Sequence, residues 1–183
     1  DQVVVPMASG SLLTKIWKGL KEFEKLGLVG SVNTKVNGAQ AEGCSPIATA
    51  FRNGQDFFKP VKPHTIAKSL AIGNPADGYY ALKTVAESQG AMDAVTDEEI
   101  VESIKLLAQT EGIFFFFSGG VTIGVLRKLV KEGRIQKNDV TVAYITGNGL
   151  KTQEAVVDSV GRPFRIPPSL SHFIKTFAIE ESA

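Results

Sequence analysis

Thr146-Gly-Asn-Gly-Leu-Lys151 directly follows an apolar run, Val140-Thr-Val-Ala-Tyr-Ile145. A hydroxyl and two glycines after such a run are typical of the carboxyl end of a parallel strand, where open α/β sheets bind ligands. A second apolar run, Gln2-Val-Val-Val-Pro6, leads into a turn of small residues, Ala8–Ser11, and then into an amphipathic helix. Two polar turns after two buried strands predict one anionic, ring-bearing ligand that is held at both ends.

The rest of the chain alternates between strand and helix patterns. Apolar residues from Leu13 to Phe23 recur at helical spacing, and Gly27 is placed to end that helix. Thr96-Asp-Glu-Glu99 is a capping box that opens a further helix, which Gly112 ends. We also expect a strand at 35–41 and helices at 45–51, 77–88, 121–131 and 170–177. This alternation predicts an α/β fold, a mostly parallel sheet with helices on both faces.

The composition narrows the class of protein. The 183 residues are 43% apolar and 21% charged, as in an ordinary globular protein, and the net charge of +1 argues against nucleic acid as a partner. No apolar run reaches the roughly 18 residues of a membrane span. The single cysteine, Cys44, excludes an internal disulfide framework and favours a reducing, cytoplasmic compartment. Two distant histidines, His64 and His172, make a metal site improbable on composition.

Two segments offer binding chemistry. Backbone N–H groups in the small-residue turn at Ala8–Leu12, together with the positive end of the following helix, favour a phosphate, although plain strand-to-helix turns use the same residues. The hydroxyl of Thr146 can bond a ring nitrogen, or it can bond its own backbone as turn residues do. Glu42 is expected in solvent, and Cys44 is expected to be a small buried apolar residue. No catalytic triad is indicated.

In series these motifs resemble threonine synthase. The resemblance is carried by Ala8-Ser-Gly-Ser11 after Val-Val-Val-Pro, Gln40-Ala-Glu-Gly, Thr65-Ile-Ala-Lys-Ser-Leu-Ala-Ile-Gly-Asn-Pro75, Asp97-Glu-Glu, Glu111-Gly-Ile and Thr146-Gly-Asn-Gly-Leu-Lys151. It runs from residue 2 to about residue 153. It implies a part of a two-domain pyridoxal-phosphate fold that corresponds to the larger, cofactor domain, with a cofactor-domain portion at 1–153 and a carboxyl-terminal tail with a short helix at 154–183.

The resemblance also implies a function. Threonine synthases use pyridoxal 5'-phosphate to convert O-phosphohomoserine and water to threonine and phosphate in threonine biosynthesis. The complete form is expected to be a cytoplasmic homodimer that binds neither nucleic acid nor membrane. Five consecutive residues would bind the cofactor phosphate, and Thr146 would meet the pyridine nitrogen. Those five are Ala8, Ser9, Gly10, Ser11 and Leu12.

Two departures from the family pattern matter. The lysine that carries the cofactor lies in a Ser-Phe-Lys-type motif of the amino-terminal half, and no such motif occurs here, so no catalytic residue is assigned. The chain also starts inside a predicted strand without Met, which indicates a piece of a longer protein.

The second departure from the family pattern is the run Phe114–Phe117, which replaces a polar, usually acidic turn. We expect these rings either to bury inward or to expose an apolar patch, and the isolated chain to associate through this segment. Replacing Phe115 and Phe116 with Thr and Glu is expected to raise solubility.

The sequence therefore predicts a carboxyl-terminal portion of threonine synthase that is inactive by itself. Three alternatives remain. A threonine dehydratase-like pyridoxal lyase would share the fold, although Thr146-Gly-Asn-Gly-Leu-Lys151 argues against it. A non-catalytic phosphate-binding module would bind phosphates without preference for an aldehyde. An inactive fragment would only pair with its other half.

Overall fold

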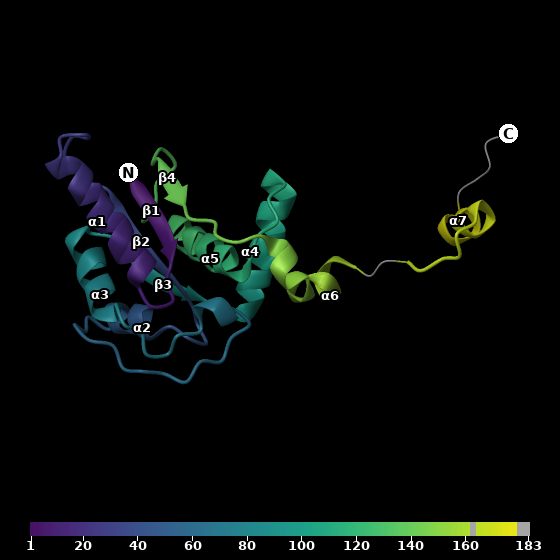
Figure 1. The fold of residues 1–183 in the computed structure, drawn as a ribbon, viewed down its shortest axis with the longest axis horizontal. Coiled ribbons are helices and arrows are strands. Elements are labelled where there is room, and N and C mark those ends of the chain that lie inside the picture. The colour runs from purple at the N-terminus through teal and green to yellow at the C-terminus, as the bar shows by residue number, and fades with distance from the viewer. Residues whose placement is uncertain (162–163, 179–183) are drawn as a thin grey trace.

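The computed structural model describes residues 1–161 and 164–178 and contains a four-stranded parallel sheet (Figure 1). The strand order is β3-β2-β1-β4, and each neighbouring pair is parallel. The strands are β1 (Gln2–Pro6), β2 (Lys35–Ala41), β3 (Met92–Val95) and β4 (Thr141–Ala143). The predicted α/β class and the parallel sheet are confirmed.

Helices cover both faces of the sheet (Figure 1). One apolar layer joins α1, α2 and α3 to one face, and a second joins α4 and α5 to the other. The α-helices are α1 (Ser11–Lys25), α2 (Pro46–Arg52), α3 (Gly78–Glu87), α4 (Asp97–Glu111), α5 (Phe117–Lys131), α6 (Val157–Val160) and α7 (Leu170–Phe177), and the 3-10 helices are η1 (Lys68–Leu70) and η2 (Gly149–Ala155).

Side-chain alternation along β1 builds the two layers. Val3 and Val5 pack with α1 and α3, whereas Val4 between them packs with α4 and α5. Successive side chains of a strand point to opposite faces, so a strand covered on both faces is apolar throughout. The unbroken Val-Val-Val run is therefore the sequence signature of a central strand.

The helix ends follow the local signals in the sequence. Gly27 adopts a φ of 68° just after α1, and Gly112 adopts a φ of 67° at the end of α4. Both are left-handed conformations that glycine adopts without a steric cost. At the start of α4, the Thr96 side chain accepts from the N–H of Glu99, and the Glu99 carboxylate accepts from the N–H of Thr96. The predicted capping box is confirmed.

One additional strand and the bounds of two other elements are the main differences from the expectations. β3 was not predicted, because its four residues include Asp93 and show no clear alternation. Helix α5 begins at Phe117, four residues before the expected start, so the phenylalanine run leads directly into it. The last strand is shorter than the apolar run 140–145 and covers only Thr141–Ala143.

The carboxyl-terminal segment lies apart from the sheet (Figure 1). Its helix α7 has ring contacts of 4.8 Å between Phe173 and Phe177 and 5.5 Å between Phe164 and Phe177, measured between centroids. The predicted division between a cofactor-domain portion and a tail stays a prediction. Within residues 1–161 and 164–178, no helix combines the length and apolar character needed to cross a membrane.

Candidate functional site

The carboxyl ends of β1 and β4 form the topological switch point of the sheet. From β1 the chain moves outward to β2 and then to β3, and it returns to the other side of β1 to form β4. Connections on the two sides of β1 therefore run over opposite faces, and open α/β sheets bind ligands beyond the carboxyl ends of the strands at such a point. The turn at 7–10 follows β1, and Thr146 follows β4, so both predicted segments lie at this edge.

The turn after β1 leaves the start of α1 open to an anion. Gly10 is the N-cap residue and has no side chain that could bond the first-turn N–H groups, and the first turn contains no acidic residue. The Ser9 hydroxyl accepts from the N–H of Ser11 at 3.3 Å. A helix of 15 residues places a partial positive charge at its amino end. These features fit the phosphate of the predicted cofactor.

The amino end of α3 holds this turn in place. The N–H of Asp77 donates to the carbonyl oxygen of Ser9 at 2.9 Å. Gly10 has a φ of 91°, and a Cβ added there would lie 3.0 Å from the Asp77 carbonyl oxygen and 3.1 Å from the Ala81 Cβ. A Gly10→Val substitution would therefore disturb the packing against α3 whether or not a ligand binds.

Thr146 is tied to the start of α5. Its hydroxyl oxygen lies 2.8 Å from the hydroxyl oxygen of Ser118, and the Ser118 hydroxyl also donates to the Thr146 carbonyl at 3.0 Å. Ser118 is buried, whereas Thr146 is half-buried. The Thr146 hydroxyl at the sheet edge is therefore held by a second hydroxyl, that of Ser118 on α5. Sequence analysis did not find Ser118, because its partner is 28 residues away.

The phenylalanine run pairs with the Thr146 turn. An isolated antiparallel bridge joins Phe115 and Asn148. The N–H of Phe116 donates to the Gly147 carbonyl at 3.3 Å, and the N–H of Gly149 donates to the Phe114 carbonyl at 3.2 Å. The run therefore forms one wall of the predicted site.

The four phenylalanines do not form one exposed patch, because two of the rings are buried and two are half-buried. Phe115 is 1% exposed and Phe117 is 6% exposed, and Phe114 and Phe116 are half-buried. The ring of Phe115 occupies the space beside Gly119, where an added Cβ would lie 2.1 Å from a ring carbon. The segment alternates like a strand, so its rings divide between the core and the wall of the site. Replacing Phe115 with Thr would therefore open the core. Association of the chain through this segment stays a prediction.

The other polar residues considered from the sequence contribute no catalytic group. Glu42 is exposed, as expected. Cys44 is buried, and burial raises the pKa of its thiol, so the thiol stays protonated and poorly nucleophilic. His64 and His172 are exposed. Among the described residues, no group of three or more His, Cys, Asp or Glu side chains could hold a metal ion.

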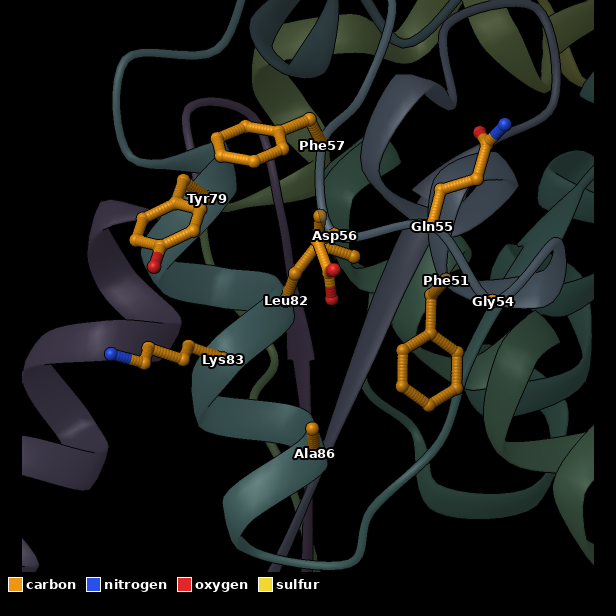
Figure 2. Close-up of a pocket in the computed structure, with 9 residues that line it drawn as sticks. All are labelled: Phe51, Gly54, Gln55, Asp56, Phe57, Tyr79, Leu82, Lys83 and Ala86. Atoms are coloured by element: carbon orange, nitrogen blue, oxygen red, sulfur yellow. The ribbon is translucent and has the colours of Figure 1, made fainter.

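A pocket of about 410 Å³ lies elsewhere, between the end of α2 and α3 (Figure 2). Phe57 and Tyr79 stack at one side with ring centroids 5.1 Å apart. The side chains of Lys83 and Gln55 point away from the centre of the pocket (Figure 2). None of the predicted site residues lines it.

Comparison with known proteins decides the family. The family model of the pyridoxal-phosphate dependent enzymes matches residues 1–147, which include the sheet, the turn after β1 and Thr146. The chain belongs to this family. Pyridoxal phosphate is the cofactor of the family, and the cofactor prediction is confirmed at that level. The Ala8–Leu12 and Thr146 assignments stay predictions.

Curated relatives of the chain are threonine synthases. The chain is 42% identical over 167 residues to threonine synthase from Methanocaldococcus jannaschii, which covers 91% of this chain and 41% of the relative. It is 38% identical over 164 residues to the enzyme from Methanosarcina acetivorans, covering 89% of this chain and 40% of the relative. The resemblance seen in the sequence is confirmed. The chain spans about two-fifths of the length of these relatives.

Solved structures show the same fold. A fungal L-serine ammonia-lyase from Rhizomucor miehei superposes with a TM-score of 0.65 at 18% identity, covering 84% of this chain and 48% of that chain. The processed form of threonine deaminase isoform 2 from Solanum lycopersicum superposes with a TM-score of 0.62 at 19% identity, covering 88% and 44%. At these identities the likeness is one of fold alone.

Proposed function

We propose that this chain forms the cofactor-domain portion of a threonine synthase, which converts O-phosphohomoserine and water to threonine and phosphate. The observation that carries the proposal is the switch point, where the start of α1, whose N-cap residue has no side chain, lies at the same sheet edge as the hydrogen-bonded hydroxyl of Thr146. The threonine synthase relatives support the choice of reaction. By the same resemblance, the complete enzyme is a cytoplasmic homodimer.

Each part of the edge has a separate task. Backbone N–H groups of Ala8–Leu12 and the positive end of α1 bind and orient the phosphate. The hydroxyl of Thr146 meets the ring nitrogen. When bound, pyridoxal phosphate supplies the electron sink for proton removal and phosphate elimination, and the protein supplies orientation and electrostatics. Phe114 and Phe116, which belong to the neighbouring wall, exclude water from the cofactor ring.

A related lyase is the second candidate. The structures named serine ammonia-lyase and threonine deaminase have the same fold, so the fold is compatible with ammonia release as well. The two reactions differ in substrate and product. Incubation of the complete enzyme with O-phosphohomoserine and, separately, with threonine distinguishes them. Phosphate release from the first substrate supports the proposal, and 2-oxo acid formation from the second supports the alternative.

We expect the isolated 183-residue chain to show no turnover of O-phosphohomoserine in the presence of added pyridoxal phosphate. The reason is the absence of the Ser-Phe-Lys-type motif that carries the reactive lysine in the resembled family. The measurement is phosphate release by the chain alone and by the complete enzyme. Turnover by the chain alone, at the rate of the complete enzyme, would contradict the assignment of the chain to one portion of the site.

A Thr146→Val substitution in the complete enzyme is expected to lower kcat by about tenfold or more, while cofactor affinity falls by less. The phosphate contacts remain, whereas the ring nitrogen loses its partner. Both quantities follow from steady-state kinetics and absorbance titration of the cofactor. Thr141→Val is the matched control, because Thr141 lies on β4 just before the Thr146 turn, and its buried hydroxyl has no hydrogen-bond partner among the described residues. Equal kcat values for the two variants would make Thr146 a turn residue only.

A further inference from the structure

Ser118 is hydrogen-bonded to both the side chain and the main chain of Thr146. It is the second residue of α5 and only 5% exposed. Its hydroxyl oxygen lies 2.8 Å from the Thr146 hydroxyl oxygen and 3.0 Å from the Thr146 carbonyl oxygen. The hydrogen bonds that described side chains make to this pair involve uncharged hydroxyls and carbonyls, including one from Thr122 to the Ser118 carbonyl at 3.0 Å.

Counting protons gives two arrangements of the pair. Each hydroxyl has one proton to donate. In this structure Ser118 donates to the Thr146 carbonyl, so the Thr146 hydroxyl donates back to Ser118 and can only accept from a ligand. If Ser118 instead donates to the Thr146 hydroxyl, the Thr146 proton is free for a ligand that accepts. The direction in which the Ser118 hydroxyl donates thus decides whether Thr146 donates to a ligand or accepts from it.

The amino end of α5 selects between these arrangements. Ser118 lies in the first turn of this 15-residue helix, where the partial positive charge of the helix disfavours a nearby cation. A protonated ring nitrogen is a cation and a donor, whereas a neutral ring nitrogen is an acceptor. The position of α5 therefore favours a neutral nitrogen, which requires Thr146 to donate. Donation from Ser118 to Thr146 also strengthens the next hydrogen bond in the chain.

We propose that Ser118 is a positioning residue that makes Thr146 a hydrogen-bond donor to the cofactor ring nitrogen. The proposal rests on the proposed function, because it requires the ring nitrogen to lie at Thr146. It concerns a residue that does not itself touch the cofactor. It separates two roles of the edge: Thr146 makes the contact, and Ser118 sets its direction.

The test is the ¹⁵N chemical shift of the ring nitrogen of ¹⁵N-labelled pyridoxal phosphate bound to the complete enzyme at one fixed pH. Ser118→Ala is expected to move the signal part of the way toward that of an unprotonated pyridine with no donor, because Thr146 keeps its proton but loses the partner that orients its hydroxyl. It is also expected to weaken cofactor binding by about 2- to 10-fold, as the loss of one hydrogen bond does. Ser118→Thr, which keeps the hydroxyl, is expected to restore both values.

Thr122→Val is the control for a merely structural role. It removes the next hydroxyl on the same face of α5, which bonds the carbonyls of Ser118 and Tyr144, and leaves the Thr146 contact intact. We expect it to lower stability without moving the nitrogen signal. If Ser118→Ala does not fold, Ser118→Cys gives the same test with a weaker donor and an intermediate shift.

The possible results distinguish the role of Ser118 from the contact between Thr146 and the ring nitrogen. An unchanged signal in Ser118→Ala, with a changed signal in Thr146→Val, would overturn the role of Ser118 and leave the Thr146 contact standing. An unchanged signal in both variants would overturn the ring contact itself. A signal typical of a protonated nitrogen in the wild type would overturn the donor role assigned to Thr146.

Discussion

Replacing Phe115 with alanine is expected to lower the free energy of unfolding by about 3–5 kcal/mol, the range for a large aromatic removed from a core. Phe115 is among the largest fully buried side chains, and its ring fills the space that the missing side chain of Gly119 leaves. Urea unfolding of the chain measures the change. Because small domains have a total stability of only about 5–15 kcal/mol, this substitution would remove much of it.

Phe23→Ala is the matched control, since Phe23 lies on α1 and is 50% exposed. We expect its substitution to cost about 1 kcal/mol or less. If Phe115→Ala costs no more than Phe23→Ala, the Phe115 ring does not lie in the core. Phe115→Leu, which retains most of the apolar volume, is expected to recover part of the loss.

A Ser11→Asp substitution is expected to weaken binding of pyridoxal phosphate to the complete enzyme by at least about tenfold. A carboxylate in the first turn of α1 would repel the phosphate at short range, where a unit charge pair contributes several kcal/mol at an effective dielectric constant near 20. The same carboxylate would stabilise the helix by about 0.3–1 kcal/mol, because the first turn contains no acidic residue. Binding and stability are therefore expected to change in opposite directions.

Ser11→Asn separates charge from shape in this test. The amide has almost the size of the carboxylate and no charge, so we expect it to alter cofactor affinity by only a few-fold. Absorbance titration gives the affinity, and thermal unfolding without cofactor gives the stability. If Ser11→Asp and Ser11→Asn bind the cofactor equally well, no phosphate lies at the start of α1.

The sequence predicted those parts of the fold that depend on neighbouring residues. The Val3–Val5 run identified a central strand, because both faces of β1 are covered. Gly27 and Gly112 end their helices through their own φ angles, and the Thr96 capping box involves residues three positions apart. The order of polar turns after strands also predicted that both turns would lie at the same edge of the sheet.

Contacts between distant segments were not predictable from the chain alone. The sequence left open whether the phenylalanine run is buried or exposed, because its partners, Gly119 and the 147–149 turn, lie beyond the reach of local patterns. The hydrogen bond between the Ser118 and Thr146 hydroxyls joins residues 28 positions apart and depends on the packing of α5 against the sheet. The same holds for Gly10, whose tight approach to Asp77 depends on the position of α3.

A crystal structure of the complete enzyme with pyridoxal phosphate tests the central claim most directly. We expect the phosphate within hydrogen-bonding distance of backbone N–H groups of Ala8–Leu12, and the ring nitrogen within hydrogen-bonding distance of the Thr146 hydroxyl. A cofactor bound away from the carboxyl ends of β1 and β4, for example in the pocket beside Phe57 and Tyr79, would contradict the account.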